Sequence, residues 1–171
     1  MNNRYLKART LARVKHKGQL YGDVPYYVHL EAVSRLASPF GTDAMIAAQL
    51  HDVLEDTETT VEEIAADFGY MIADAVGYMT DGKLKDRLER KTHVNLRLSS
   101  LDISEEAGRI ALIVKACDRL ANVRASLHSP EKYFSMYQQE HPAFRQAVYR
   151  KGLCEAIWWE LDNLLKLSEA S

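Results

Sequence analysis

A histidine and an aspartate stand side by side in HDVLEDT, at the end of an otherwise apolar stretch. Burying such a pair is costly unless another group uses both side chains. Adjacent helical side chains point about 100 degrees apart, so His51 and Asp52 can converge only on an atom between them, and a metal ion fits that description. Glu55 and Asp56 add carboxylates close by. The alternative for this short motif is a solvated helix end with a core histidine.

A further acidic position, Asp118, lies inside the apolar segment KACDRLANVR. Lys115 at i−3 and Asn122 at i+4 form one polar stripe with it, beside positions that belong to a core. A carboxylate next to a core needs a partner. That partner is either a metal or an ordinary ion pair with Arg119 or Arg124.

His29 follows PYYV and, taken alone, is equally compatible with a core histidine whose hydrogen bonds are satisfied.

The elements that must position all these residues are predicted to be helices, with no strand pattern, internal repeat or linker. The expected helices are residues 4–14; residues 26–36, opened by Pro25; a buried helix from Thr42 through HDVL; one from a Thr60–Glu63 capping box to Gly69; one from Tyr70; the charged stretch DGKLKDRLERKTHVNLRL; EEAGRIALIVKACDRLANVRASL, capped by Ser104 and closed by Pro130; and residues 142–167.

Length and composition predict one compact all-α domain spanning residues 1–171. A chain of 171 residues can bury a core without staples, and its Gly and Pro contents of 8 and 4 are low. A net charge of −2 gives no broad attraction for a nucleic-acid backbone. The distant Cys117 and Cys154 look like reduced core side chains, and no apolar run suits a membrane span or signal peptide. We therefore expect a cytoplasmic protein.

The order of a His, then HD, then a distant Asp resembles that of the HD-superfamily phosphohydrolases. The segments HKGQ, PYYVH, HDVLEDT, MTDG, LERK and VKACDRLANVR are similar to successive motifs of the RelA/SpoT-type alarmone hydrolase domain, in particular its small single-domain members. The resemblance covers roughly residues 4–126. It implies a compact HD-domain bundle of about seven to nine helices.

The resemblance also implies roles for individual residues. His29, His51, Asp52 and Asp118 occupy the positions of the family's four metal ligands, and Glu55 and Asp56 those of its water-activating carboxylates. A site of two imidazoles and two carboxylates suits Mn²⁺, with Fe²⁺ or Zn²⁺ as alternatives by ligand type, and the family favours Mn²⁺. The bound metal would polarise a phosphoryl oxygen while a carboxylate takes a proton from water.

By the family's chemistry, the reaction converts guanosine 3′,5′-bis(diphosphate), ppGpp, to GDP and pyrophosphate. The expected substrate contacts are Asn122 by motif, Tyr21 by stacking on a base, His16 in the pocket wall, and basic residues near the phosphates: Lys83, Lys85, Arg87, Arg90, Lys91 and Lys115. For His16 the alternative is a surface residue at a helix end. For the charge run it is a solvated helix face, so only one or two of these cations should matter.

The sequence departs from the family pattern in the loop after the first motif. Family members carry an Arg-Lys pair there that helps to hold the guanine nucleotide, whereas this shorter loop reads QLYGD. Leu30 also replaces a usual proline. The alternatives to ppGpp hydrolysis are hydrolysis of other phosphorylated nucleotides or of RNA 3′-end pyrophosphate, and a non-catalytic alarmone sensor. No synthetase activity is expected without a second domain, and Trp158-Trp159 is either core or a homodimer contact.

Overall fold

The expected all-α fold is confirmed. The computed structural model describes residues 2–80 and 86–166, and within these ranges nine helices of at least eight residues surround one buried core, with the short helix α4, one 3₁₀ turn and one two-stranded hairpin. The elements are α1 (Asn3–Lys15), β1 (Leu20–Tyr21), β2 (Val24–Pro25), α2 (Tyr27–Ala37), a 3₁₀ turn (Ser38–Phe40), α3 (Thr42–Leu50), α4 (Val53–Asp56), α5 (Val61–Phe68), α6 (Tyr70–Met79), α7 (Arg87–Ser99), α8 (Glu106–Ser126), α9 (Glu131–Val148) and α10 (Glu155–Lys166).

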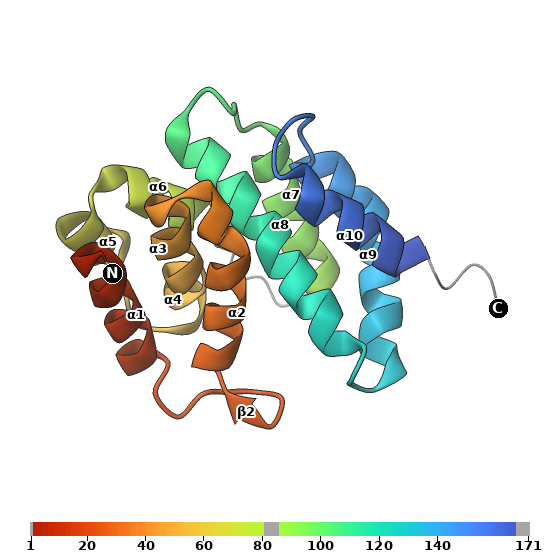
Figure 1. Cartoon of the computed structure of the whole chain (residues 1–171), viewed down its shortest axis with the longest axis horizontal. Helices are drawn as coiled ribbons and strands as arrows, with labels where there is room; N and C mark the ends of the chain where they lie inside the picture. Colours follow the sequence, from red (N-terminus) through yellow and green to blue (C-terminus); the bar gives the residue numbers. More distant parts are fainter. Residues whose placement is uncertain (1, 81–85, 167–171) are drawn as a thin grey trace.

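Helix α8 is the central element. It runs between a group formed by α1 to α6 and a group formed by α7, α9 and α10 (Figure 1), and it contacts α2, α3, α6, α9 and α10. Most of its side chains are buried because apolar residues occur all round it, from Ile110 to Val123. Gly108 is required near its start, since a Cβ there would lie 2.8 Å from the backbone oxygen of Asp102. A polar residue in the middle of α8 is thus held rigidly between the two groups.

Several predicted boundaries are close to those observed. The helices expected at residues 4–14 and 26–36 correspond to α1 and α2. The capping box at the start of α5 is present, with the Glu63 amide donating to Thr60 Oγ1 at 3.3 Å and the Thr60 amide to Glu63 Oε2 at 2.9 Å. Ser104, by contrast, does not cap α8. Its amide donates to Asp102 Oδ1 at 2.9 Å in a local turn, and the capping position falls on Glu105.

The prediction of one helix running through HDVL is wrong, because α3 ends at Leu50. Asp52 adopts φ −105° and ψ −2°, and its carbonyl accepts the amide of Asp56 at 2.9 Å to start the short helix α4. The prediction that the chain contains no strand is also wrong, because β1 and β2 form a hairpin. Two-residue strands are too short to show alternation, and Gly22, at φ +60°, supplies the turn between Tyr21 and Val24, which pair with each other.

The predicted final helix at residues 142–167 is wrong as well. Pro142 lies inside α9, which begins after Pro130, and a turn containing Gly152 at φ +86° separates α9 from α10. Proline is favoured in the first turn of a helix and costly inside one, so Pro142 in the sequence indicates a helix start. Pro130, which was predicted to close the preceding helix, instead directly precedes α9. Helix α9 packs against α7 and α8.

None of the helices within residues 2–80 and 86–166 has the length and apolar content needed to cross a bilayer.

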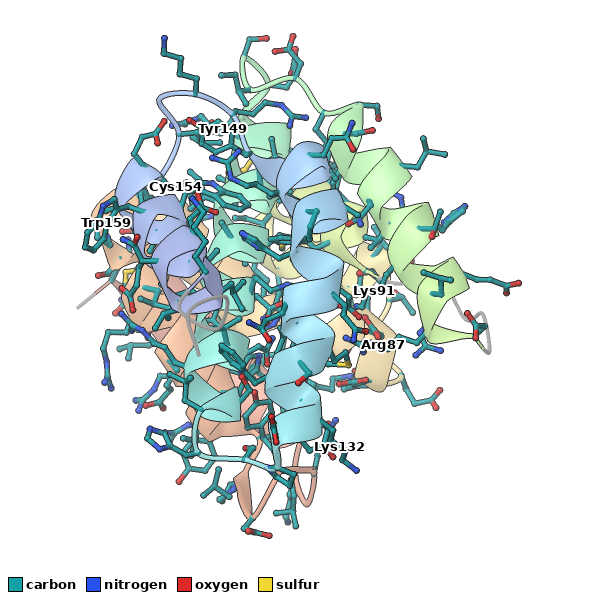
Figure 2. All side chains as sticks on the ribbon, turned by 90° about the vertical axis from the view of Figure 1, so that its right-hand side faces the viewer. Arg87, Lys91, Lys132, Tyr149, Cys154 and Trp159 are labelled. Atoms are coloured by element: carbon teal, nitrogen blue, oxygen red, sulfur yellow. The ribbon has the colours of Figure 1, made fainter. Side chains whose placement is uncertain are left out.

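Trp158 is 1% exposed and belongs to the core, whereas Trp159 is 72% exposed on the outer side of α10 (Figure 2). The pair therefore divides between core and surface.

Candidate functional site

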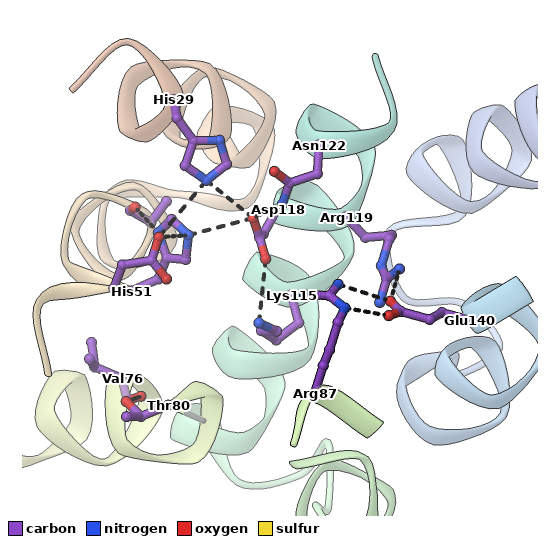
Figure 3. A network of polar contacts seen from close by, with 12 residues as sticks. His29, His51, Val76, Thr80, Arg87, Lys115, Asp118, Arg119, Asn122 and Glu140 are labelled. Carbon is purple, nitrogen blue, oxygen red and sulfur yellow. Dashed lines mark hydrogen bonds and ion pairs between the residues drawn. The ribbon is translucent and has the colours of Figure 1, made fainter. Parts of the chain in front are cut away.

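The four predicted metal ligands come together at one point. His29 lies in the first turns of α2, His51 and Asp52 lie where α3 gives way to α4, and Asp118 lies in the middle of α8. Helices α2, α3 and α8 pack against one another, so residues up to 89 positions apart in the sequence become neighbours. Figure 3 shows His29, His51 and Asp118 directed toward a common point.

The spacing of their polar atoms is that of a small ion site. The ligand-type atoms of His29, His51 and Asp118 all lie within 4.8 Å of one another. Asp118 Oδ1 is 3.2 Å from His29 Nε2 and 3.6 Å from His51 Nε2, and Asp52 Oδ2 is 3.0 Å from His51 Nε2. Two imidazoles and a carboxylate with this geometry suit a divalent metal in a hydrolase.

His51 supports this interpretation most directly. Its Nδ1 lies 2.9 Å from the carbonyl oxygen of Ala48, and because a carbonyl can only accept, Nδ1 carries the proton. Its Nε2 is therefore the lone-pair nitrogen when the ring is neutral. That atom is fully buried and has no hydrogen-bond partner among the described residues. A buried acceptor without a partner is rare, and a metal would satisfy it.

The electrostatics of the cluster favour positive charge at the same point. Burial alone lowers the pKa of His51, but the neighbouring carboxylates of Asp52 and Asp118 raise it to about 10. Burial conversely opposes ionisation of Asp118, yet Lys115 and the two histidines hold the pKa of that carboxyl well below its usual range. The same histidines lower the pKa of Asp52. Both carboxylates are thus held ionised, as metal ligands must be.

Aromatic side chains form the wall on the side of the hairpin. The ring of Tyr21 stacks on His29, with centroids 4.6 Å apart and planes 10° apart. Tyr26 donates its hydroxyl proton to Asp52 Oδ2 at 2.6 Å, and its ring stacks on His16 at 4.8 Å. Burial, together with nearby carboxylates, raises the pKa of both tyrosines, so both hydroxyls remain donors.

His16 is buried behind this wall rather than exposed at a helix end. It is 4% exposed, and its Nδ1 contacts Gln19 Oε1 at 2.7 Å. Gln19 in turn donates to Asp56 Oδ2 at 3.0 Å. His16 therefore lies in the second layer of the pocket, and any role in substrate binding stays a prediction.

The predicted polar stripe on α8 is present. Lys115 Nζ donates to Asp118 Oδ2 at 3.3 Å, and Asn122 Nδ2 donates to Asp118 Oδ1 at 2.6 Å. Asn122 Oδ1 accepts the hydroxyl proton of Tyr21 at 2.6 Å. Asp118 is held by these neighbours and by the histidines, and not by the ion pair with Arg119 or Arg124 that was the alternative. Arg119 pairs with Glu140 and Arg124 with Glu160.

The cluster opens into a cavity of about 150 Å³ whose lining is mostly polar. Glu55 lines this cavity together with Asp52 and Asp118, whereas Asp56 is directed to Gln19. The two candidate bases are therefore not equivalent in position. Glu55 is the carboxylate that shares the cavity with the ion site.

Cations line the opposite wall of the cavity, on α7 and α8. Arg87, Lys91, Lys115 and Arg119 are among the lining residues, and Figure 2 shows Arg87 and Lys91 beside α9. Glu140 on α9 holds two of them, accepting from Arg87 Nε at 2.8 Å and from Arg119 at 2.9 Å (Figure 3). Arg90 is not among the lining residues, and Lys83 and Lys85 lie outside the described residues.

Six lining residues were not predicted as site residues, and two of them are Tyr26, just before α2, and Val94 on α7. Asn95 on α7, Arg119 on α8, and Tyr137 and Phe144 on α9 complete the wall. Arg119 is 7% exposed and lies over the ring of Phe144 at 4.3 Å and that of Tyr137 at 5.0 Å. The segment CDRLANVR places Arg119 next to Asp118 in the sequence, which suggested Arg119 only as an ion-pair partner of Asp118 and not as a residue of the cavity wall. Tyr137 lies before the predicted start of the final helix and Phe144 lies within it, and no pattern indicated that either residue lines a cavity.

Known proteins share this fold and sequence over nearly the whole chain. The chain matches no family model. It is 36% identical over 169 residues to guanosine-3′,5′-bis(diphosphate) 3′-pyrophosphohydrolase MESH1 of Xenopus tropicalis. The aligned region covers 93% of this chain and 91% of that protein. It is 32% identical over 165 residues to a probable GTP pyrophosphokinase of Mycobacterium leprae, of which it spans only 20%.

A solved structure, described as a metazoan ortholog of SpoT that hydrolyzes ppGpp, has the same fold. It superposes with a TM-score of 0.83 at 22% identity, covering 98% of this chain and 97% of the other. The sequence identity to the Xenopus protein over almost the full length of both chains decides the family. The chain belongs to the MESH1-type family of guanosine-3′,5′-bis(diphosphate) 3′-pyrophosphohydrolases.

Proposed function

We propose that this protein is a metal-dependent hydrolase that removes the 3′-pyrophosphate of ppGpp, giving GDP and pyrophosphate. The observation that carries the proposal is the convergence of His29, His51, Asp52 and Asp118 beside a polar cavity that Glu55 also lines. Membership of the pyrophosphohydrolase family supplies the substrate. The Xenopus relative is named for this reaction, and this chain retains the groups that the reaction needs.

The proposed ligands are the two Nε2 atoms of the histidines and the carboxylates of Asp52 and Asp118. A mixed nitrogen and oxygen set of this kind suits Mn²⁺, with Fe²⁺ and Zn²⁺ as alternatives. When bound, the ion supplies Lewis-acid polarisation of a phosphoryl oxygen and acidifies water. The protein holds the donors in place beforehand, because Ala48 fixes the ring of His51 and Tyr26 fixes the carboxylate of Asp52.

Glu55 is proposed as the base that takes a proton from the attacking water. Glu55 lines the cavity beside the proposed ion site. A general base must lie within reach of the proton that it takes. Water adds to the phosphorus of the 3′-pyrophosphate, and the bond from phosphorus to the ribose 3′ oxygen breaks. The leaving 3′ oxygen gains a proton and becomes the hydroxyl of GDP.

The cations on α7 and α8 are proposed to bind the phosphates. Lys91 and Lys115 line the cavity on the side opposite the hairpin, together with Arg87 and Arg119. Phosphate oxygens bind such groups by charge-assisted hydrogen bonds. Arg90, His16 and Tyr21 are kept as weaker candidates for substrate contact, since Arg90 and His16 do not line the cavity and one face of the Tyr21 ring covers His29.

The test is a hydrolysis assay with ppGpp, GTP, GDP and an RNA carrying a 3′-pyrophosphate, each with Mn²⁺, Fe²⁺ or Zn²⁺. Release of pyrophosphate and GDP from ppGpp is expected, with Mn²⁺ giving the fastest turnover. Glu55→Gln should lower kcat by about 10²–10⁴-fold while Mn²⁺ binding, measured by calorimetry, remains. Turnover of the RNA alone would move the function to RNA ends. Binding of ppGpp with unchanged biological effect in Glu55→Gln would indicate a sensor.

A further inference from the structure

Tyr21 contacts the proposed metal site in two separate ways, although it supplies no ligand to it. Its hydroxyl donates to Asn122 Oδ1 at 2.6 Å, and its ring lies flat on His29. The residue comes from the hairpin, His29 from α2 and Asn122 from α8, so one side chain joins three elements. Tyr21 therefore contacts one candidate ligand, His29, directly and reaches a second, Asp118, through Asn122.

The hydrogen bond from Tyr21 holds the Asn122 amide at its oxygen end. A carboxamide has one accepting oxygen and one donating nitrogen, and the Tyr21 hydroxyl donates to the oxygen at 2.6 Å. The nitrogen donates to Asp118 Oδ1 at 2.6 Å, which the acceptor-only carboxylate also requires. The two contacts favour the same orientation of the amide. The Tyr21 hydroxyl therefore restricts movement of the amide that donates to Asp118.

The stacked ring acts on the second ligand. The centroids of Tyr21 and His29 are 4.6 Å apart with planes 10° apart, and His29 is 5% exposed. A ring lying flat on an imidazole restricts its rotation and excludes water from that face. Groups in the layer behind metal ligands commonly contribute about 10- to 100-fold to metal affinity by fixing ligand orientation.

We propose that Tyr21 is a positioning residue for the metal site, which orients Asp118 through Asn122 and His29 through ring stacking. This inference rests on the proposed function, because it assumes that the cluster binds a divalent metal. It differs from direct substrate contact by Tyr21. A positioning residue changes metal affinity in the absence of nucleotide, whereas a base-stacking residue changes KM for ppGpp when the metal is saturating.

The experiment measures Mn²⁺ binding to the metal-free protein by calorimetry, without nucleotide, in the wild type and three variants. Tyr21→Phe keeps the ring and removes the hydroxyl, and we expect its Mn²⁺ affinity to fall about tenfold. Tyr21→Leu also removes the ring and should bind more weakly still. Tyr27→Phe is the matched control, since Tyr27 is 37% exposed on α2 with its ring against Arg13, and its affinity should equal that of the wild type.

A double variant tests whether the hydroxyl acts through Asn122. If it does, Tyr21→Phe should add no further loss of Mn²⁺ affinity to Asn122→Ala. At saturating Mn²⁺, Tyr21→Leu should keep the KM of the wild type for ppGpp, because a role in stacking on a base would be lost with the ring. Equal Mn²⁺ affinities of wild type and Tyr21→Phe would overturn the inference, as would a raised KM alone. Failure of the wild type to bind Mn²⁺ would instead count against the proposed function.

Discussion

The Nδ1 atom of His51, which follows the end of α3, lies 2.9 Å from the carbonyl oxygen of Ala48 in the last turn of that helix. This single contact fixes the ring tautomer and directs Nε2 toward Asp52 and Asp118, at 3.0 and 3.6 Å. The ring is 2% exposed, so it cannot turn outward to find water. A histidine held in this way is prepared for a partner on Nε2.

Divalent metal should therefore stabilise the fold, and removing it should weaken the fold. Saturation with Mn²⁺ at about 100 times its Kd should raise the free energy of unfolding by about 2.7 kcal/mol, because only the folded chain brings the ligands together. Urea unfolding with Mn²⁺ and with a chelator measures the difference. His51→Gln should abolish it, and His128→Gln, at an exposed position, should leave it intact. An equal Mn²⁺ effect in His51→Gln would refute the assignment.

Glu140 should contribute more to stability than an ordinary surface carboxylate. Its carboxylate binds Arg87 and Arg119, and Arg119 is 7% exposed, so removal of the charge leaves a largely buried guanidinium without its partner. We expect Glu140→Gln to lower the free energy of unfolding by about 1–3 kcal/mol. Glu106→Gln is the control, since Glu106 pairs with Arg109 at 3.5 Å on an exposed surface, and should cost under about 0.5 kcal/mol.

The stabilising effect of Glu140 should depend on pH in a defined direction. Burial alone raises the pKa of this carboxyl, but the two arginines hold it below the ordinary 4.5. A carboxyl whose pKa is lower in the folded chain stabilises the fold above its unfolded pKa and loses that effect as pH falls through the folded value. The difference between wild type and Glu140→Gln should be constant from pH 7 to about pH 5 and shrink below pH 4.5. A difference that grows on acidification would contradict this.

Part of the proposed ion site could be predicted from the sequence because those residues lie in short local patterns. His51 and Asp52 are adjacent, and Lys115, Asp118 and Asn122 share a helical face, so spacing alone predicted which side chains would be neighbours. The meeting of His29 with them depends on how α2, α3 and α8 pack, which no local pattern specifies. That step came from a resemblance in the order of motifs, and in the packed helices the ligand-type atoms of His29, His51 and Asp118 lie within 4.8 Å of one another. Their role as metal ligands stays a prediction.

The far wall of the cavity could not be predicted in the same way. Tyr137 and Phe144 lie on α9, and Pro142 between them favoured a helix start over a helix interior. The role of Tyr21 was equally hidden, because the turn at Gly22 joins strands of two residues each, too short to show alternation. Contacts of this kind arise from tertiary packing and leave no period in the sequence.

The choice between Glu55 and Asp56 as the base is open to a direct comparison. Glu55 lines the cavity next to the ligands, whereas Asp56 Oδ2 accepts a hydrogen bond from Gln19 Nε2 at 3.0 Å. Removal of a general base typically lowers kcat by about 10²–10⁴-fold. We expect a loss of that size in Glu55→Gln and a loss at least tenfold smaller in Asp56→Asn.

Both variants should be assayed with ppGpp at saturating Mn²⁺, after calorimetry has shown that each binds Mn²⁺ as the wild type does. Plots of kcat against pH add a second criterion. Loss of the base should remove the acidic limb from the profile of Glu55→Gln, because no group then needs to be deprotonated for proton transfer. Asp56→Asn should keep that limb, since its carboxylate only anchors Gln19 and the loop that leads to the hairpin. The reverse pattern would make Asp56 the base and leave Glu55 as a wall of the cavity.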